Sequence, residues 1–213
     1  MARVVVITGG GSGIGAACAR LMSAAGDRVF ITGRREAPLH KIAVETGATA
    51  LVGDAADGDV WRERLLPPIL DQTHGIDVLI CSAGGMGNSA AADTSDRQWR
   101  EALDANLNSA FVSVRACLPS LIACRANAIC PGWVTTPMAD EEMIPLMQEH
   151  GLSLTEAYQR VCRDVPLRRP ASPEEIARAC QFLCSPQAAI ISGATLVADG
   201  GSSIVDVPTL AFT

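Results

Sequence analysis

The segment best suited to chemistry is the glycine-rich stretch TGGGSGIG at residues 8–15. It follows an apolar, β-branched run at 3–8 and opens an alanine-rich helical run at 14–26. A strand, a tight turn and a helix in this order present free backbone N–H groups at the positive end of the helix, where a pyrophosphate binds. The glycine pattern gains specificity from this context. We therefore expect a dinucleotide site here, and a purely structural glycine turn is the alternative.

Each glycine of the turn has an expected task. Gly9 makes the turn, Gly13 lets the backbone approach the ligand, and Gly15 lets the helix pack against the strand. Ser12 and Ile14 lie between these glycines and belong to the same predicted site.

The end of the second predicted strand bears on which dinucleotide binds. A ribose 2′-hydroxyl is usually held by an acid about 20 residues beyond the glycines. Gly33 stands at that position, and Arg34 and Arg35 follow it. Guanidinium groups suit a 2′-phosphate, which favours NADP(H) over NAD(H). NAD(H) stays open, because both arginines could be solvated residues at a helix start and Glu36 could bind a ribose.

Strand-like and helix-like runs alternate along the chain, which predicts βαβ units with helices on both faces of a parallel sheet. The fold class is therefore α/β: a Rossmann-like, doubly wound, three-layer α/β/α domain covering residues 1–213. The predicted strands are 3–8, 28–32, 48–52, 77–81, 126–130 and 194–201. The predicted helices are 14–26, 36–46, 57–72, one or two within 95–123, and 171–185.

Residues 137–170 interrupt this alternation with two helical pieces after a strand's C-terminal end. Ligands of open α/β sheets bind at that edge, so we interpret the segment as a substrate lid, with a plain surface insertion as the alternative.

Composition narrows the class of partner. With 17 basic and 23 acidic residues the net charge is −6, and no basic stripe is present, which argues against a nucleic-acid partner. No stretch approaches the roughly 20 apolar residues of a membrane span. The eight cysteines form no CxxC pair, and Cys180 and Cys184 are expected to pack in the core rather than bind metal. We expect a cytoplasmic protein with free thiols.

Several motifs together resemble the short-chain dehydrogenase/reductase family over nearly the whole chain. They are Thr8 with the spacing Gly9-x3-Gly13-x-Gly15, CSAGG at 81–85, Asn106 in NLNSAF, and NAICPGWVTTPM at 127–138. PLRRPASPEEIA and ISGATLVADGG resemble the C-terminal third of the family. The resemblance implies hydride transfer between a nicotinamide cofactor and a secondary alcohol or ketone.

The resemblance also implies site residues. Asn106 matches the family's catalytic asparagine, which holds a water in the proton relay. Ser82 replaces the usual asparagine at its position, which predicts a weaker tie between strand and loop. Thr136 is expected to hold the carboxamide or phosphates, with Thr135 as the alternative. The remaining implied cofactor-binding residues are Asp54, Ala55, Ala83, Gly84, Pro131, Gly132 and Val134. Asp54 is alternatively a local turn former.

The family's catalytic Ser and Tyr-x-x-x-Lys have no counterpart in the sequence. The only tyrosine is Tyr158, followed four residues later by Cys162, and the only lysine, Lys41, lies in the second predicted helix. An unperturbed tyrosine has a pKa near 10 and is a poor base without a nearby cation. In the family these groups lie on a βα unit after the helix that carries Asn106. Here PSLIAC runs directly into RANAIC, so one βα unit of about 30 residues or more is missing.

Two explanations of this gap stay open: the unit is truly deleted, or the sequence as given lacks it. Its absence is expected to strip an apolar cover from the sheet and from the Asn106 helix. The corresponding functions are an oxidoreductase whose catalytic pair lies outside this chain, or a catalytically inactive nucleotide-binding module or truncated fragment. The resemblance implies a homodimer or homotetramer if the unit is present.

Overall fold

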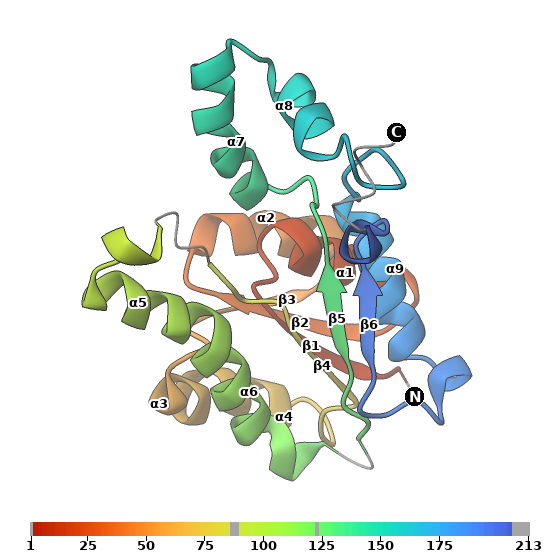
Figure 1. The fold of residues 1–213 in the computed structure, drawn as a ribbon. Coiled ribbons are helices and arrows are strands. Elements are labelled where there is room, and N and C mark those ends of the chain that lie inside the picture. The colour runs from red at the N-terminus through yellow and green to blue at the C-terminus, as the bar shows by residue number, and fades with distance from the viewer. Residues whose placement is uncertain (1, 86–89, 122–123, 206–213) are drawn as a thin grey trace.

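The computed structural model describes residues 2–85, 90–121 and 124–205. Its main sheet contains β1 (Val4–Thr8), β2 (Arg28–Gly33), β3 (Thr49–Val52) and β4 (Val78–Cys81). These strands are parallel and lie in the order β3-β2-β1-β4 (Figure 1). This is the order of a Rossmann-like half-sheet, and it confirms the predicted α/β class.

Helices cover both faces of this sheet because alternate residues of β1 point to opposite sides. Val5 and Ile7 pack in one cluster with residues of α1 (Gly13–Ala24), α2 (Glu36–Thr46) and α9 (Pro173–Leu183). Val4 and Val6 pack in a second cluster on the opposite face. That face is covered by α3 (Gly58–Val60), a π-helical turn (Trp61–Leu65), α4 (Leu66–Leu70) and α6 (Ser109–Cys117).

A longer helical stretch leads into α6. It consists of α5 (Asp96–Leu103) and a second π-helical turn (Asp104–Asn108). The helix was predicted within 95–123, but the π-helical turn was not. The remaining short helices are 3₁₀ turns at Ala91–Asp93, Leu118–Ser120, Pro186–Ala188 and Ser202–Ile204. The end of the predicted 95–123 helix, at 122–123, lies outside the described residues.

The last two strands do not join the main sheet. β5 (Ala128–Pro131) and β6 (Thr195–Ala198) form a separate, parallel two-stranded sheet. A strand of a sheet with helices on both faces is expected to be buried, and for the strand predicted at 126–130 this expectation was wrong, because Ala128, Cys130 and Pro131 are exposed. The physical reason is the missing strand: β4 and β5 are both edge strands, with no strand described between them.

One residue marks where that strand would begin. Leu121 forms a parallel bridge with Ile76, just before β4, and the Ile76 N–H donates to the Ser120 carbonyl at 3.1 Å. Among the described residues, Leu121 thus pairs beside the start of β4 as an isolated bridge.

Helix α9 connects the two sheets. Its Ala177 packs in the same cluster as Val78 and Ile80 of β4, and the helix also contacts β5. Arg125 fixes the approach to β5, because its guanidinium donates to four carbonyls around the end of α9. These acceptors are Leu183, Ser185, Ala188 and Ile191.

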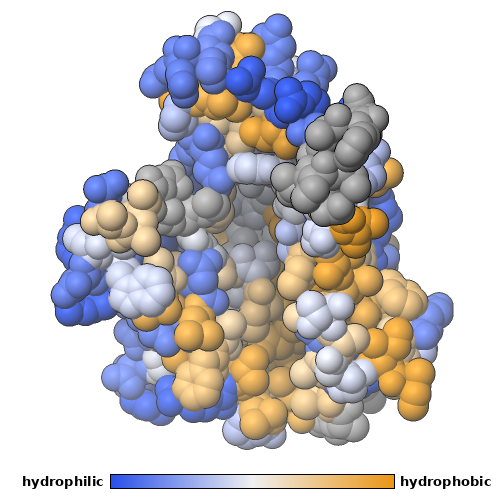
Figure 2. Space-filling view, in the orientation of Figure 1, coloured by the Kyte–Doolittle hydropathy of each residue, from blue (hydrophilic) through white to orange (hydrophobic). Residues whose placement is uncertain are grey.

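The expected loss of an apolar cover is confirmed. Four large side chains of the α6 region, spaced four, three and four residues apart, are exposed; we call them the α6 stripe: Leu107, Phe111, Val114 and Leu118. Leu196 and Val197 of β6 are exposed as well. Figure 2 shows the molecule hollowed between the α6 side and the β5–β6 side, with apolar surface around the lower part of the hollow.

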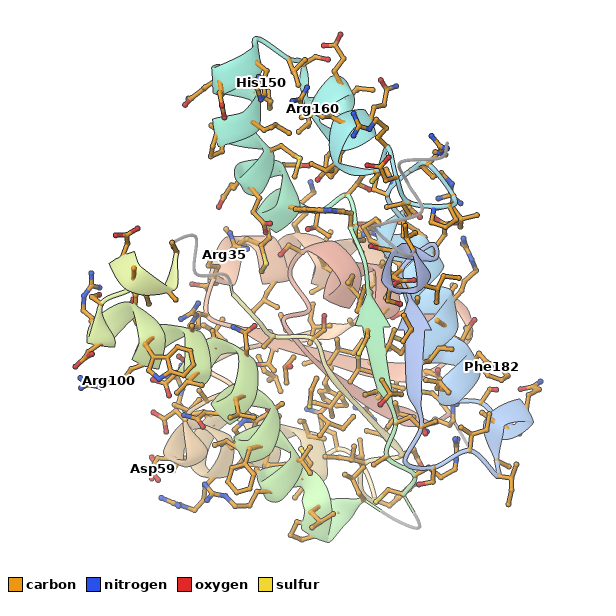
Figure 3. The ribbon with its side chains drawn as sticks, in the orientation of Figure 1. Arg35, Asp59, Arg100, His150, Arg160 and Phe182 are labelled. Carbon is orange, nitrogen blue, oxygen red and sulfur yellow. The ribbon has the colours of Figure 1, made fainter. Side chains whose placement is uncertain are left out.

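The segment interpreted as a lid contains the two expected helices, α7 (Pro137–His150) and α8 (Leu154–Val161), which project beyond the sheet (Figure 1). Met143 and Ala157 pack between them, and the Tyr158 hydroxyl donates to Asp140 at 2.8 Å. Figure 3 places His150 at the outer end of α7, away from the glycine turn. Among the described helices, none is both long and apolar enough to cross a membrane.

Candidate functional site

The glycine turn is built against the loop that follows β4. Gly9 has φ +67°, and a Cβ at this position would lie 2.7 Å from the Ser82 carbonyl oxygen and 2.8 Å from the Ala83 nitrogen. The Thr8 hydroxyl accepts the N–H groups of Ser82 and Ala83 at 3.2 and 3.1 Å. The end of β1 is therefore tied to the 82–85 loop by the Thr8 hydroxyl and the loop backbone. These two bonds do not use the Ser82 side chain, so its replacement of asparagine does not weaken them.

Gly13 lies against the start of α7. Its φ is +52°, and a Cβ here would come within 3.2 Å of Thr136 Cγ2. Thr136 is the N-cap of α7, and its hydroxyl accepts the Ala139 N–H at 3.2 Å. Thr135 instead directs its hydroxyl to the Ala171 carbonyl at 3.4 Å. Of the two threonines, Thr136 is the one in contact with the glycine turn.

The N-terminus of α1 carries no competing acid. Ser12 is the N-cap, its side chain makes no capping bond, and the first turn contains no Asp or Glu. Because neither a side-chain acceptor nor a carboxylate occupies this helix end, an anion fits there. Gly15 is buried in the same turn, whereas Ile14 packs against the core and its side chain serves the fold.

The two arginines after β2 have different partners. Arg35 donates to Ser12 Oγ at 3.3 Å, and Figure 3 shows it at the start of α2. Arg34 lies 4.0 Å from Asp54 Oδ2, and its side chain is 71% exposed. Gly33 is the last residue of β2 and precedes both arginines, so the position where a ribose-binding acid is expected carries no carboxylate. Arg35 is thus the arginine that contacts the N-cap of α1, whereas Arg34 lies near Asp54.

Asp54 and Ala55 form the turn after β3. The Asp54 carboxylate accepts the Ala56 N–H at 2.9 Å, which is the local turn that the sequence left open as its alternative role. Ala55 is buried, and its carbonyl accepts the indole N–H of Trp61 at 3.0 Å.

Asn106 lies in the π-helical turn before α6 and holds the loop after β4. Its Oδ1 accepts the Gly85 N–H at 3.2 Å, and its Nδ2 donates to the carbonyls of Gly85 and Ala102 at 2.8 and 2.9 Å. Gly84 adjoins the same amide. The Asn106 amide thus holds the loop at Gly85, and the catalytic role that the resemblance implies stays a prediction.

The segment after β5 completes the edge. Pro131 ends β5, and a Cβ on Gly132 would lie 2.9 Å from Asp199 Cα, so this turn packs closely against the end of β6. Val134 is buried and pairs with Ala171.

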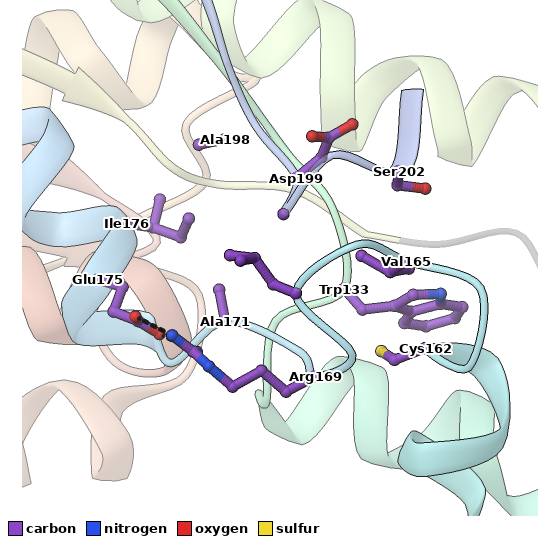
Figure 4. A pocket seen from close by; sticks show the side chains of 12 residues that line it. Trp133, Cys162, Val165, Arg169, Ala171, Glu175, Ile176, Ala198, Asp199 and Ser202 are labelled. Carbon is purple, nitrogen blue, oxygen red and sulfur yellow. Dashed lines mark hydrogen bonds and ion pairs between the residues drawn. The ribbon is translucent and has the colours of Figure 1, made fainter. Parts of the chain in front are cut away.

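A cavity of about 220 Å³ lies beside this edge, between the end of α8 and the start of α9 (Figure 4). Trp133, Cys162 and Ala198 contribute to its wall. At its rim Arg169 forms a two-bond ion pair with Glu175, at 2.7 and 2.8 Å, which lowers the Glu175 pKa to about 2.

The two residue types of the missing catalytic pair lie elsewhere. Tyr158 is buried between the lid helices, where burial and the bond to Asp140 raise its pKa. Lys41 is exposed on α2. Tyr158 thus belongs to the lid and Lys41 to the surface of α2, and they do not form the family's Tyr-x-x-x-Lys pair. Cys180 and Cys184 pack against the core cluster, which confirms their predicted structural role.

Sequence reasoning missed three features of the site. These are the double acceptor role of the Thr8 hydroxyl, the contact between Arg35 and Ser12, and the π-helical turn around Asn106. A signal existed for the first, because a threonine that ends an otherwise apolar, buried strand needs a hydrogen-bond partner.

Comparison with known proteins agrees with this geometry. The sequence profile of the short chain dehydrogenases matches residues 3–126, and a second profile, described as enoyl-(acyl carrier protein) reductase, matches residues 122–203. Protein MoaE of Klebsiella aerogenes is 57% identical over 257 residues, with both chains fully covered. A putative ketoacyl reductase of the monensin polyketide synthase in Streptomyces virginiae is 28% identical and covers 93% of this chain and 96% of its own.

Solved structures have the same fold. An aldohexose dehydrogenase of Thermoplasma acidophilum superposes with a TM-score of 0.86 at 22% identity, covering 97% of this chain and 96% of its own. Actinorhodin polyketide ketoreductase, solved with NADPH, also has a TM-score of 0.86, at 24% identity, with 94% and 97% covered. The profile match over more than half of the chain and the 57% identical relative establish the family. The chain belongs to the short-chain dehydrogenase/reductase family of NAD(P)-dependent oxidoreductases.

Proposed function

We propose that this protein is an NADP(H)-dependent oxidoreductase that interconverts a secondary alcohol and a ketone. The observation that carries the NADP(H) preference is the bond from Arg35 to Ser12, together with exposed Arg34 next to it in the chain and Gly33 in place of a ribose-binding acid. Two solved relatives of the same fold, actinorhodin polyketide ketoreductase and the L-sorbose reductase of Gluconobacter frateurii, contain NADPH. Relatives named ketoacyl reductase and galactitol 2-dehydrogenase support the substrate class.

The residues at the sheet edge divide the binding task. The free end of α1 takes the pyrophosphate, and the two guanidiniums take the 2′-phosphate through charge-assisted hydrogen bonds. The Thr136 hydroxyl accepts the Ala139 N–H and keeps its own proton to donate to a carboxamide or phosphate. Asn106 and Thr8 hold the 82–85 loop against this space. When bound, the nicotinamide supplies or accepts the hydride.

Proton transfer to the substrate oxygen needs a group that this edge does not provide among the described residues. Tyr158 donates to Asp140 between the lid helices and Lys41 is exposed on α2, and in the sequence Cys162 stands where the family's Tyr-x-x-x-Lys pair would have its lysine. This chain's own residues therefore bind the cofactor, and proton transfer falls to the family's tyrosine–lysine pair, which lies outside the sequence as given.

Cofactor titration tests the binding half. We expect NADPH to bind at least 10-fold more tightly than NADH. A charge-assisted hydrogen bond contributes about 1.5–3 kcal/mol, and solvent exposure of both arginines reduces their joint contribution to about 2 kcal/mol, or roughly 30-fold. The double variant Arg34→Gln/Arg35→Gln should lose that factor for NADPH and leave NADH affinity unchanged.

Arg97→Gln is the matched control, because Arg97 is an exposed arginine of α5 that pairs with Glu101. Equal affinities for the two cofactors, or a double variant that binds NADPH like the control, would refute the NADP(H) assignment. NADPH binding without turnover of any ketone, even when the missing unit is restored in one continuous chain, would instead identify an inactive nucleotide-binding module.

A further inference from the structure

Three cysteines gather where α9 packs against α1. Cys18 lies in the middle of α1, and Cys180 and Cys184 lie one turn apart at the end of α9, on the same side as the buried Ala177. Cys18 belongs to one core cluster, the other two pack against it, and all three are free thiols. In the described part of the chain, no group of three His, Cys, Asp or Glu side chains could hold a metal ion. Thiol chemistry is therefore the chemistry that this contact supports.

The Cys18 and Cys180 side chains touch each other. The Cys18 S–H donates a hydrogen bond to the Cys180 sulfur. This bond and burial raise the pKa of Cys18, and the same bond lowers the pKa of Cys180, which ionises more readily of the two. Cys180 is partly exposed, whereas Cys18 is 0% exposed. Because the thiolate is the reactive form of cysteine, an oxidant from the solvent reacts with Cys180 before Cys18.

We propose that Cys18 and Cys180 form an oxidation site, at which hydrogen peroxide produces a reversible disulfide between α1 and α9. The Cys180 thiolate attacks one peroxide oxygen, and the products are a sulfenic acid and a hydroxide that takes up the proton Cys180 released. The Cys18 sulfur then attacks the sulfenic sulfur, so that the S–S bond forms, the S–O bond breaks and water leaves. In total the two thiols lose two electrons and two protons, and one peroxide becomes two waters. A dithiol reductant reverses the oxidation by thiol–disulfide exchange.

The surroundings favour this link over others. The two sulfur atoms are already in contact, so a bond of about 2.0 Å requires only a small shift of the side chains. Arg3 fixes the end of α9, because its guanidinium donates to the Cys184 carbonyl at 2.6 Å and also binds the Asp27 carboxylate. The link joins residues far apart in the sequence and would restrict the unfolded chain strongly. We therefore expect the oxidised protein to be the more stable form.

Peptide mapping of the full 213-residue chain tests the link. After peroxide treatment of the folded protein, the remaining thiols are alkylated in denaturant and the chain is digested without reductant. The Cys18–Cys180 pair should be the main cross-linked product, the melting temperature should rise by about 5 °C or more, and dithiothreitol should reverse both changes. No link, a main link between other cysteines, or an unchanged melting temperature would overturn the proposal. The proposed NADP(H) preference is measured separately by cofactor titration, and neither result depends on the other.

Cys18→Ser separates the two steps of the oxidation. Serine keeps a hydroxyl donor beside Cys180 and supplies no sulfur, so a sulfenic acid should persist at Cys180 and react with a cyclic 1,3-diketone, without a cross-link. Cys180→Ser should remove both the trapped acid and the cross-link. Cys117→Ser is the matched control, because Cys117 is also 0% exposed and lies in the cluster on the opposite face of the main sheet. Trapping at Cys184 in place of Cys180, or loss of the link in the control, would refute the assignment.

Discussion

The contact between the glycine turn and the lid can be tested with Gly13→Ala. The new methyl group would lie 3.2 Å from Thr136 Cγ2, and the backbone would keep φ at +52°. The left-handed conformation costs a non-glycine residue about 1–2 kcal/mol. Lower entropy of the unfolded chain returns about 0.4–1 kcal/mol, and the tight methyl contact adds a cost of about 0.5–1 kcal/mol. We expect the free energy of unfolding to fall by about 1–2 kcal/mol.

Thr136→Ser separates the backbone cost from the contact. Serine keeps the hydroxyl that caps α7 and lacks the Cγ2 methyl group that the alanine side chain of the Gly13→Ala variant would meet. In the Thr136→Ser background, Gly13→Ala should therefore cost about 0.5 kcal/mol less than in the original chain, a coupling typical of side chains in contact.

Urea denaturation of the four proteins of this cycle measures the coupling, and the melting temperature should follow at about 2–4 °C per kcal/mol. An unchanged m value is needed for the comparison. Strictly additive effects would show that Gly13 and Thr136 do not touch in solution. A stabilising Gly13→Ala would show that the turn does not hold a left-handed residue.

Three other perturbations test the site and its surroundings. Asn106→Leu breaks the bonds to Gly85 and Ala102, so unfolding free energy should fall by about 1–3 kcal/mol in a urea titration, and an unchanged value would exclude the positioning role. Tyr158→Phe removes the donor to Asp140 and should cost about 1 kcal/mol while NADPH affinity, measured by fluorescence, stays within twofold; a larger change would place Tyr158 at the site. Because Arg169 lowers the Glu175 pKa to about 2 from 4.5, their pair stabilises the fold above about pH 4.5 and loses this effect as pH falls toward 2. Acid unfolding curves of the original chain and Arg169→Gln should therefore differ near pH 5 and converge near pH 2, and a constant difference would contradict this assignment.

Local sequence patterns predicted the elements because each pattern has a local physical cause. The β-branched run at 4–8 is buried on both faces. In the glycine turn, Gly9 and Gly13 have positive φ, which glycine adopts readily. Capping boxes begin three helices at Ser95, Ser153 and Ser172, so their starts are encoded within a few residues.

Long-range pairing was predicted less well. Residues 126–130 alone do not show that β5 has no strand between it and β4, because the residues of such a strand would lie elsewhere in the sequence. Arg34 and Arg35 were recognised as a pair, yet their separate contacts with Asp54 and Ser12 depend on how β2, β3 and α1 meet. The hydrogen bonds of Asn106 were not predicted for the same reason, since its partners at Gly85 and Ala102 are set by the π-helical turn.

The attachment of β5 and β6 through α9 has a consequence for local unfolding. The two strands pair with each other, and the structure shows them linked to the main sheet by α9 and by the Arg125 bonds around its end. A two-stranded sheet has little stability of its own in water. Opening of α9 should therefore release β5 and β6 together as one cooperative unit while β1–β4 stay folded. Amides of Ile129 and Val197 would then exchange with solvent at a common rate, well above the rate for Val6 and Ile31 in the interior of the main sheet.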